Sequence, residues 1–592
     1  MSTKRRRSMI LGLAVLAAAW TAAAAPAQEP AEDAATFGEV IDVQLVNVEV
    51  WVTDREGNPV TGLTADDFEV REDGEPVEIS NFAEVRSPPV AEPFAPTAPV
   101  EAPVDRPVED RPLELEDLLR EPQPAPGMGF LVLYFDELFS KPTGRGQLIE
   151  DLRTFLELRR VPPERVLVLR QDKGLRVEAN FGSSRAELEA ALDRLETPAT
   201  RGIQTWADEK QALARLQQDW ELEAVVRASQ GVDPCDRFLP RAFNQVQFHI
   251  NQSRARIGET IEHLTDTAGF LAGLPGPKTL IYVSDGLALT PGADLLSFAK
   301  YLCPGRQDDR RLDYLEGMGE PFRRLSRHAN ANRVTIYTLQ ALGLRGHLSA
   351  TSADQRGVAR TTGALSRYNS ESRMQFRQGM NFLADETGGR AVFNRGRFIE
   401  ELEQIAEDMT SFYSLAYAPP HAGDGLEHRI NVKVRGDGLR VRHRPGYRDK
   451  SANQRLIERL QSALYLNLMA NPLGVRLGAG GVKEGEKGRL TVPLHVRIPV
   501  ERITFLPQAG GEVASLKVLV LTRDEREAKT SFKQESYRLP RPAAADSVSL
   551  VLDLDLEEGI HTIAFGVRDD ATQEASFVAT GVDLRRPAGA SG

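Results

Sequence analysis

The strongest constraint on the fold comes from two apolar segments that each end on an aspartate. Residues 130–135 (Phe-Leu-Val-Leu-Tyr-Phe) lead into Asp136, and residues 279–283 (Thr-Leu-Ile-Tyr-Val) lead into Ser284 and Asp285. Neither segment alternates apolar and polar residues, which is typical of central strands in a parallel sheet covered on both faces. Ligands of open α/β sheets collect outside the carboxyl ends of the strands. We therefore expect both carboxylates in one crevice, where Mg²⁺ would find the oxygen ligands it prefers.

The segment around these strands alternates strand-like and helical patterns. This alternation runs from residue 128 to residue 419, and it predicts an α/β fold with a doubly wound, mainly parallel sheet and right-handed crossovers. Residues 184–187 (Ser-Arg-Ala-Glu) have the spacing of a capping box at the start of one helix. Residues 200–258 are polar and mostly helical in pattern, and we interpret them as an insertion into this domain.

The N-terminal region predicts a secretory signal, a β module and a linker. Residues 4–7 are basic, the run that follows is apolar, and a small-x-small site ends at Ala27, so residues 1–27 read as a signal peptide. An uncleaved anchor is the alternative. The signal indicates export to the periplasm, the cell surface or the medium. Alternating strands in residues 38–86 predict a small β module, and the many prolines of residues 87–127 predict an extended linker.

The C-terminal region predicts further β structure. Residues 430–434 and 439–441 are expected to pair as a hairpin that closes an α/β domain spanning 128–450. Residues 451–484 read as a helix and a glycine-rich link. About seven alternating strands in residues 485–585 predict an antiparallel β-sandwich.

Charge, cysteine and histidine content narrow the classes of function. The formal net charge of -12 argues against a nucleic-acid partner, and no run after the signal is long enough to cross a membrane. Cys235 and Cys303 predict one disulfide in an exported chain, with two free thiols as the alternative. The nine histidines are scattered and no His-Glu-x-x-His occurs, so we interpret them as solvated or core residues rather than metal ligands.

Three segments, in the expected order, resemble the von Willebrand factor type A domain of exported bacterial proteins. Residues 276–286 (Gly-Pro-Lys-Thr-Leu-Ile-Tyr-Val-Ser-Asp-Gly) match a family strand that ends in Ser-Asp-Gly. Residues 50–63 and 413–420 resemble a subgroup with a β module ahead of the domain. The resemblance covers roughly residues 38–450. It implies a type A fold and a metal-ion-dependent adhesion site.

The resemblance also implies a ligand set for Mg²⁺, from which this sequence departs at one position. The family pattern Asp-x-Ser-x-Ser corresponds here to Asp136, Glu137, Leu138, Phe139 and Ser140, and Leu138 cannot coordinate an ion. Water can replace one missing oxygen ligand. The expected metal ligands are Asp136, Ser140 and Asp285, with Ser284 and a threonine, Thr205 or Thr200, as further candidates. The alternative is a degenerate site in which the two aspartates cap turns and bind no ion.

The function implied is that of an exported module that binds another protein and is not an enzyme. In that mechanism an acidic side chain of the partner completes the coordination of the ion. A metal-independent structural or assembly subunit of an envelope complex is the first alternative. A metal-assisted hydrolase is the second, and it would need a general base, for which Glu137 is the only near candidate. The partner and the oligomeric state are not encoded in any recognisable motif.

Overall fold

A computed structural model of the chain describes residues 45–86, 129–141, 145–158, 161–197, 200–305, 317–341, 359–421, 423–466, 470–485, 489–508, 511–524, 530–542 and 545–585. The expected signal peptide (1–27), the first residues of the expected β module (38–44) and the expected linker (87–127) lie outside the described residues. Among the helices that are described, none is both long enough and apolar enough to span a bilayer.

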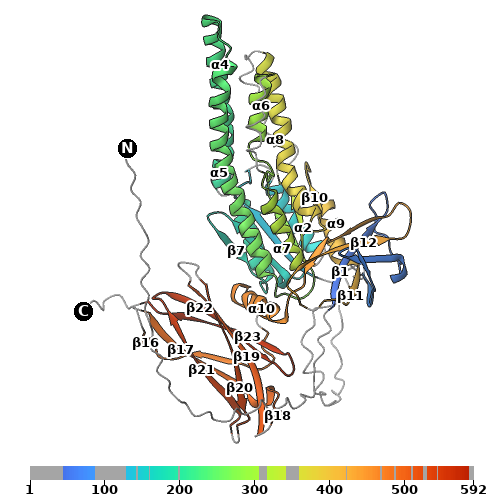
Figure 1. The fold of residues 1–592 in the computed structure, drawn as a ribbon, viewed down its shortest axis with the longest axis vertical. Coiled ribbons are helices and arrows are strands. Elements are labelled where there is room, and N and C mark those ends of the chain that lie inside the picture. Colours follow the sequence, from blue (N-terminus) through green and yellow to red (C-terminus); the bar gives the residue numbers. More distant parts are fainter. Residues whose placement is uncertain are drawn as a thin grey trace, which may run out of the picture. The chain divides into compact units, whose positions relative to one another are not determined.

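Among the described residues, six strands form the sheet at the centre of the α/β part (Figure 1). Their order is β10-β9-β8-β5-β6-β7, and neighbours are parallel except β6 and β7. The α/β class expected from the sequence is confirmed at this level, as a mixed sheet with parallel strands. The strands are β5 (Phe130–Asp136), β6 (Val166–Gln171), β7 (Leu175–Ala179), β8 (Lys278–Val283), β9 (Val334–Leu339) and β10 (Ala391–Val392).

Helices cover both faces of this sheet, which is why its central strands are apolar without alternation. Leu131, Leu133 and Phe135 of β5 share an apolar cluster with α2, α3 and α9. Val132 and Tyr134 of the same strand point to the other face, where α5, α7 and α8 pack. The helices are α2 (Arg145–Leu158), α3 (Arg185–Glu196), α5 (Cys235–Phe270), α7 (Gly319–Ala331), α8 (Ala359–Asp385) and α9 (Ile399–Thr410).

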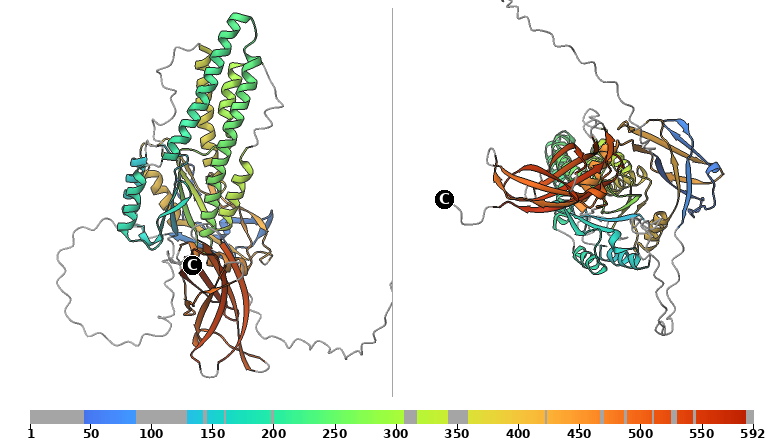
Figure 2. Two further views of the ribbon diagram at one scale, coloured as in Figure 1. Left: turned by 90° about the vertical axis from the view of Figure 1, so that its left-hand side faces the viewer. Right: turned by 90° about the horizontal axis from the view of Figure 1, so that it is seen from below.

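Long helices extend this part into a bundle with its own apolar core. Helices α4 (Thr200–Gln230), α5, α6 (Ala293–Leu302) and α8 lie side by side, as Figure 1 and the left view of Figure 2 show. Leu216, Phe238 and Phe298 are buried among them, and a disulfide joins Cys235 to Cys303. Helix α5 runs without a break past residue 258, so the expected insertion, which contains α4 and the first part of α5, does not end at a boundary between elements. We call α4, α6 and the matching parts of α5 and α8 the helical extension.

Two four-stranded sheets within the described residues combine strands from before and after the α/β part. Their orders are β13-β1-β11-β4 and β14-β12-β2-β3, and they share one apolar core. Within residues 45–86, β2 pairs with β3, whereas β1, β2 and β4 also pair with strands that follow the α/β part. The expected hairpin of residues 430–434 and 439–441 is wrong, because β12 pairs with β2 and β13 with β1. The strands are β1 (Val46–Thr53), β2 (Phe68–Glu72), β3 (Glu75–Val77), β4 (Asn81–Arg86), β11 (Ser411–Tyr417), β12 (Glu427–Val434), β13 (Arg440–His443) and β14 (Gly446–Arg448).

The C-terminal residues contain helix α10 (Ala452–Leu466) and two more sheets with antiparallel pairings. Alternate residues of β17, β19, β21 and β22 point into one shared apolar cluster. A second cluster buries Leu460 of α10 against Leu519 and Phe577. The strands are β15 (Arg476–Ala479), β16 (Lys483–Glu484), β17 (Leu490–Pro499), β18 (Leu506–Gln508), β19 (Gly511–Asp524), β20 (Thr530–Pro540), β21 (Ser547–Leu556), β22 (Ile560–Asp569) and β23 (Ala575–Asp583).

Candidate functional site

The sheet brings the two aspartates singled out in the sequence to the same edge. Strands β5 and β8 are parallel neighbours, with Phe135 opposite Val283. Asp136 is the last residue of β5, and Asp285 follows β8 in the loop beyond it. The backbone N–H of Asp285 donates to the carbonyl oxygen of Phe139, which ties the two loops together. Both aspartates therefore lie at one edge of the sheet, although Asp136 is not among the residues that line the cavity beside Asp285.

The carboxylate of Asp136 is buried and is used by the protein's own donors. Its Oδ1 accepts a hydrogen bond from the backbone N–H of Leu138 at 2.8 Å. Its Oδ2 accepts from the hydroxyls of Tyr282 at 2.5 Å and Thr260 at 3.5 Å. Burial raises the pKa of Asp136 to about 6, although the hydrogen bonds from Tyr282 and Leu138 act to lower it. Both oxygens of Asp136 thus accept hydrogen bonds, and Oδ2 links β5 to β8 and α5.

The rest of the expected Asp-x-Ser-x-Ser loop also forms contacts within the protein. Glu137 is fully buried and pairs with Arg145 at 2.6 Å and with Arg170 at 3.3 Å. The hydroxyl of Ser140 donates to the main-chain carbonyl of Asp136. In the second loop, the Ser284 hydroxyl contacts the backbone of Gly286. The hydroxyls of Ser140 and Ser284 therefore form hydrogen bonds with the backbone of their own loops.

Asp285 differs from Asp136, because one carboxylate oxygen of Asp285 accepts no hydrogen bond from the described residues. Its Oδ2 accepts from the backbone N–H of Lys141, whereas its buried Oδ1 receives no hydrogen bond from any described residue. Burial raises the pKa of Asp285 to about 7, although the backbone N–H and the charge of Lys141 act to lower it. A buried polar atom without a partner is costly, and such an atom is a reason to look for a ligand.

A small cavity adjoins Asp285. Its volume is about 20 Å³, enough for one water molecule or a small ion, and Thr205 and Glu209 line it together with Lys141. Gly202 allows this arrangement, since a Cβ there would lie 2.7 Å from the Glu137 carbonyl oxygen, so only glycine lets α4 come this close. The expected candidate Thr205 therefore shares a cavity with Asp285, while Thr200 begins α4.

Glu209 is a cavity residue that the sequence argument missed. Burial raises the pKa of Glu209 to about 7, and the charge of Lys141 only partly offsets this. Glu209 lies one helical turn after Thr205 on α4, and residues four apart share a helix face. The four-residue spacing from Thr205 could have indicated Glu209 as a further residue of the same helix face. The residues that fit a cation are thus Asp285, Thr205 and Glu209, whereas Asp136 and Ser140 fit poorly because internal hydrogen bonds occupy them.

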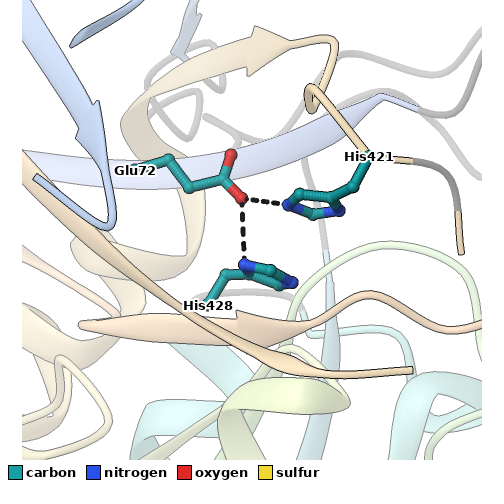
Figure 3. A group of neighbouring side chains, drawn as sticks. All are labelled: Glu72, His421 and His428. Carbon is teal, nitrogen blue, oxygen red and sulfur yellow. Dashed lines mark hydrogen bonds and ion pairs between the residues drawn. The ribbon is translucent and has the colours of Figure 1, made fainter. Parts of the chain in front are cut away.

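A second group of titratable side chains lies where β2 meets β12. Glu72 at the end of β2 faces His421 and His428, whose rings stack with centroids 3.8 Å apart (Figure 3). A neighbouring set joins His421 to Asp424 and Asp449, and either set has the side chains to hold a metal ion. No histidine was expected to ligate a metal. The pairing of β2 with β12, which assembles the group, was not visible in the local sequence pattern.

Hydrogen bonds to carboxylates set the electrostatics of both histidines. Burial alone would lower the pKa of His421, but its contacts with Asp449 and Glu72 hold that pKa above the usual value. The pKa of His428 is raised in the same way against burial, by Asp73 and Asp424.

No protein-family model matches this chain, and no curated protein matches it either.

Proposed function

We propose that the chain is a protein-binding module of the von Willebrand factor type A kind, which receives its partner at the carboxyl edge of the sheet, beside the base of the helical extension. The resemblance of residues 276–286 to the family and the mixed sheet with parallel strands support this proposal. Because residues 1–27 are expected to be a signal peptide, we further propose that the protein is exported to the periplasm, the cell surface or the medium. We propose no catalytic role, since both ion pairs of Glu137 occupy the one base considered for a hydrolase.

The observation that carries the proposal is the unpartnered oxygen of Asp285. A buried carboxylate without a donor costs free energy, which a fold used only as a scaffold would avoid with an asparagine or an apolar residue. A cation or a donor group of a partner would satisfy this oxygen. The position suits such a ligand because Asp285 lies at the edge where α/β sheets collect their ligands.

If a cation takes part, its ligands differ from the set expected from the sequence. Asp285, Thr205 and Glu209 line the cavity and offer carboxylate and hydroxyl oxygens, which Mg²⁺ prefers. Lys141 supports the metal-independent alternative. Its charge acts on both Asp285 and Glu209, so the lysine can balance these carboxylates without an ion.

Calorimetric titration with Mg²⁺ and Mn²⁺ decides between these two modes. We expect the purified full-length chain to bind one ion saturably and the variant Asp285→Asn to lose this binding. Asp266→Asn is the matched control, because Asp266 is an exposed carboxylate on α5. Equal binding by Asp285→Asn would place the ion elsewhere. Saturable binding by neither protein would favour the mode in which Lys141 replaces the cation.

Site-specific photo-crosslinking in the source cells tests the binding surface itself. A crosslinking residue at Trp206, which lines the cavity, is expected to capture a distinct protein, whereas one at the exposed Val551 of β21 is not. The capture should decrease when Asp285→Asn is added. Identical products from both positions, or capture that ignores Asp285→Asn, would contradict the proposed surface.

A further inference from the structure

The group formed by Glu72, His421 and His428 has an uneven distribution of hydrogen bonds. One oxygen of Glu72, Oε1, lies 2.7 Å from His421 Nε2 and 3.4 Å from His428 Nδ1, and it accepts from the Tyr447 hydroxyl at 3.0 Å. The other oxygen, Oε2, is buried and receives no hydrogen bond from the described part of the chain. The Tyr417 hydroxyl lies near this carboxylate but outside hydrogen-bonding geometry. Three groups thus converge on one oxygen while its twin is left without a donor.

Each histidine ring is held from its far side by a second carboxylate. His421 Nδ1 lies 2.9 Å from an oxygen of Asp449, and His428 Nε2 lies 3.2 Å from an oxygen of Asp424. In the tautomers that place N–H on these far nitrogens, the nitrogens facing Glu72 carry lone pairs. Histidines that bind metals have this arrangement, in which the outer N–H donates to a carboxylate and the inner nitrogen is free to ligate.

We propose that Glu72, His421 and His428 bind a divalent transition-metal ion, with Zn²⁺ as the first candidate, and that Asp449 and Asp424 orient the two imidazoles. Imidazole nitrogen with carboxylate oxygen suits Zn²⁺, whereas Mg²⁺ and Ca²⁺ prefer oxygen alone. The three ligand atoms lie within 4.8 Å of one another. Ligands about 2.0–2.1 Å from a tetrahedral Zn²⁺ lie about 3.3 Å apart, so small side-chain rotations close the site.

The fourth coordination position has a candidate in Asp73. Its Oδ2 lies 2.9 Å from His428 Nδ1, and its side chain is 54% exposed, so either this carboxylate or a water molecule can complete the tetrahedron. The three ligands themselves are mostly buried, with side-chain exposures of 3% for Glu72, 9% for His428 and 22% for His421. This burial fits an ion with a structural task.

The ion would join two segments that are far apart in the sequence. Glu72 ends β2, while His421 follows β11 and lies 349 residues later. An ion that binds the folded chain and not the unfolded chain stabilises it by mass action. The ion therefore fastens the N-terminal strands to the returning segment at the edge of their shared core.

Titration of the metal-free full-length chain with Zn²⁺ and Co²⁺ tests the proposal. We expect one ion per chain by calorimetry, a visible Co²⁺ absorption of tetrahedral type, and a higher melting temperature with Zn²⁺ that a chelator reverses. Glu72→Gln and His428→Gln should each lose the stoichiometric site. His495→Gln should keep it, because His495 is an exposed histidine on β17.

Two outcomes would overturn the proposal. One is weak, unsaturable binding by the natural chain, which means adventitious ions only. The other is a one-to-one site that survives both Glu72→Gln and His428→Gln. The visible Co²⁺ absorption of the natural chain reports the coordination geometry without any variant, so the absence of a tetrahedral spectrum would contradict the proposal even if a variant fails to fold. Asp285→Asn should leave Zn²⁺ binding intact, which separates this proposal from the one for the carboxyl edge.

Discussion

Glu137 is a buried charge near the carboxyl edge whose partners lie within the protein. Its carboxylate is fully buried and pairs with Arg145, a side chain that is itself almost completely inaccessible to solvent. Arg170 of β6 adds a second contact at 3.3 Å. Removing one partner of such a pair leaves the other charge buried and uncompensated, and that loss costs more than the pair contributes.

We therefore predict that Glu137→Gln lowers the free energy of unfolding by about 3–5 kcal/mol. Urea unfolding followed by circular dichroism measures the change. Glu320→Gln is the control, because Glu320 pairs with Arg323 and Arg327 on an exposed helix face, where solvent screens the ion pairs, so its loss should cost far less than the loss of Glu137. Equal effects of the two substitutions would contradict the role assigned to Glu137.

At the same scale, sequence reasoning located the aspartates but not what surrounds them. The unbroken apolar runs predicted that both aspartates lie at the carboxyl edge of the sheet, because strands buried on both faces lack alternating polar residues. The state of Asp136 depends instead on the hydroxyls of Tyr282 and Thr260, which come from a neighbouring strand and from α5. Tyr282 read as one more apolar residue of β8. A contact between side chains on different elements leaves no periodic signal, so the difference between Asp136 and Asp285 could not be foreseen.

At the scale of elements, the helical extension combines a small apolar core with charged partners between its helices. Trp220 packs edge-on against Phe238, and the disulfide between Cys235 and Cys303 connects the start of α5 to the end of α6. Ion pairs such as Arg241 with Glu223 connect α4 to α5. The extension thus has both apolar and covalent means of keeping its helices together.

His249 gives the extension a dependence on pH. It lies on α5, contacts Ser253 at 3.2 Å, and faces the charges of Arg256 and Asp208. Burial and the Arg256 charge lower the pKa of His249 to about 4. Between the ordinary value of about 6.5 and this value, the unfolded chain binds a proton that the folded chain does not, so stability falls as the pH falls.

We predict that His249→Gln reduces the loss of stability between pH 7 and pH 5 by about 2 kcal/mol, the equivalent of roughly one and a half pKa units. Urea unfolding of the variant and the natural chain at the two pH values gives this difference. His495→Gln is the control substitution, at an exposed histidine on β17. An unchanged pH response in His249→Gln would show that His249 titrates normally in the folded state.

Elements with a local signal were predictable, and elements defined by distant partners were not. Helix α3 begins where the capping box indicated, because Ser184 and Glu187 exchange hydrogen bonds over one turn. The hairpin expected from β12 and β13 failed because β1 and β2 are their partners. Local alternation of apolar and polar residues identifies a strand, but it does not determine which other strand pairs with it.

At the scale of the whole molecule, helix α10 connects the α/β part to the C-terminal sheets. The Ser462 hydroxyl donates to the Phe270 carbonyl oxygen at 2.6 Å and accepts from the Gly273 N–H at 3.0 Å. Tyr465 stacks on Phe270 with ring centroids 4.0 Å apart. The opposite face of α10 packs on the apolar cluster that contains Leu460.

We predict that Gly273→Ala weakens this connection and lowers the free energy of unfolding by about 1–3 kcal/mol. A Cβ at Gly273 would lie 2.5 Å from Ser462 Oγ and 2.7 Å from Arg459 Cα, so α10 must move away. Hydrogen exchange in α10 should increase. Gly258→Ala is the control, because a Cβ there meets open space within α5, and it should stabilise the chain by up to about 1 kcal/mol. Unchanged exchange in α10 would refute the prediction.

The pairing of β1 with β11 and β13 has a consequence for the order in which the chain is made. Val50 lies opposite Tyr413 on one side and His443 on the other, so both edges of β1 depend on residues that are synthesised much later. At about 5–20 residues per second, the ribosome needs roughly 20–70 s to pass from β1 to β11. During that interval the nascent strand exposes unpaired edges, which are prone to aggregate. The first strand of the described residues can therefore complete its pairing only after β11 and β13 have been synthesised.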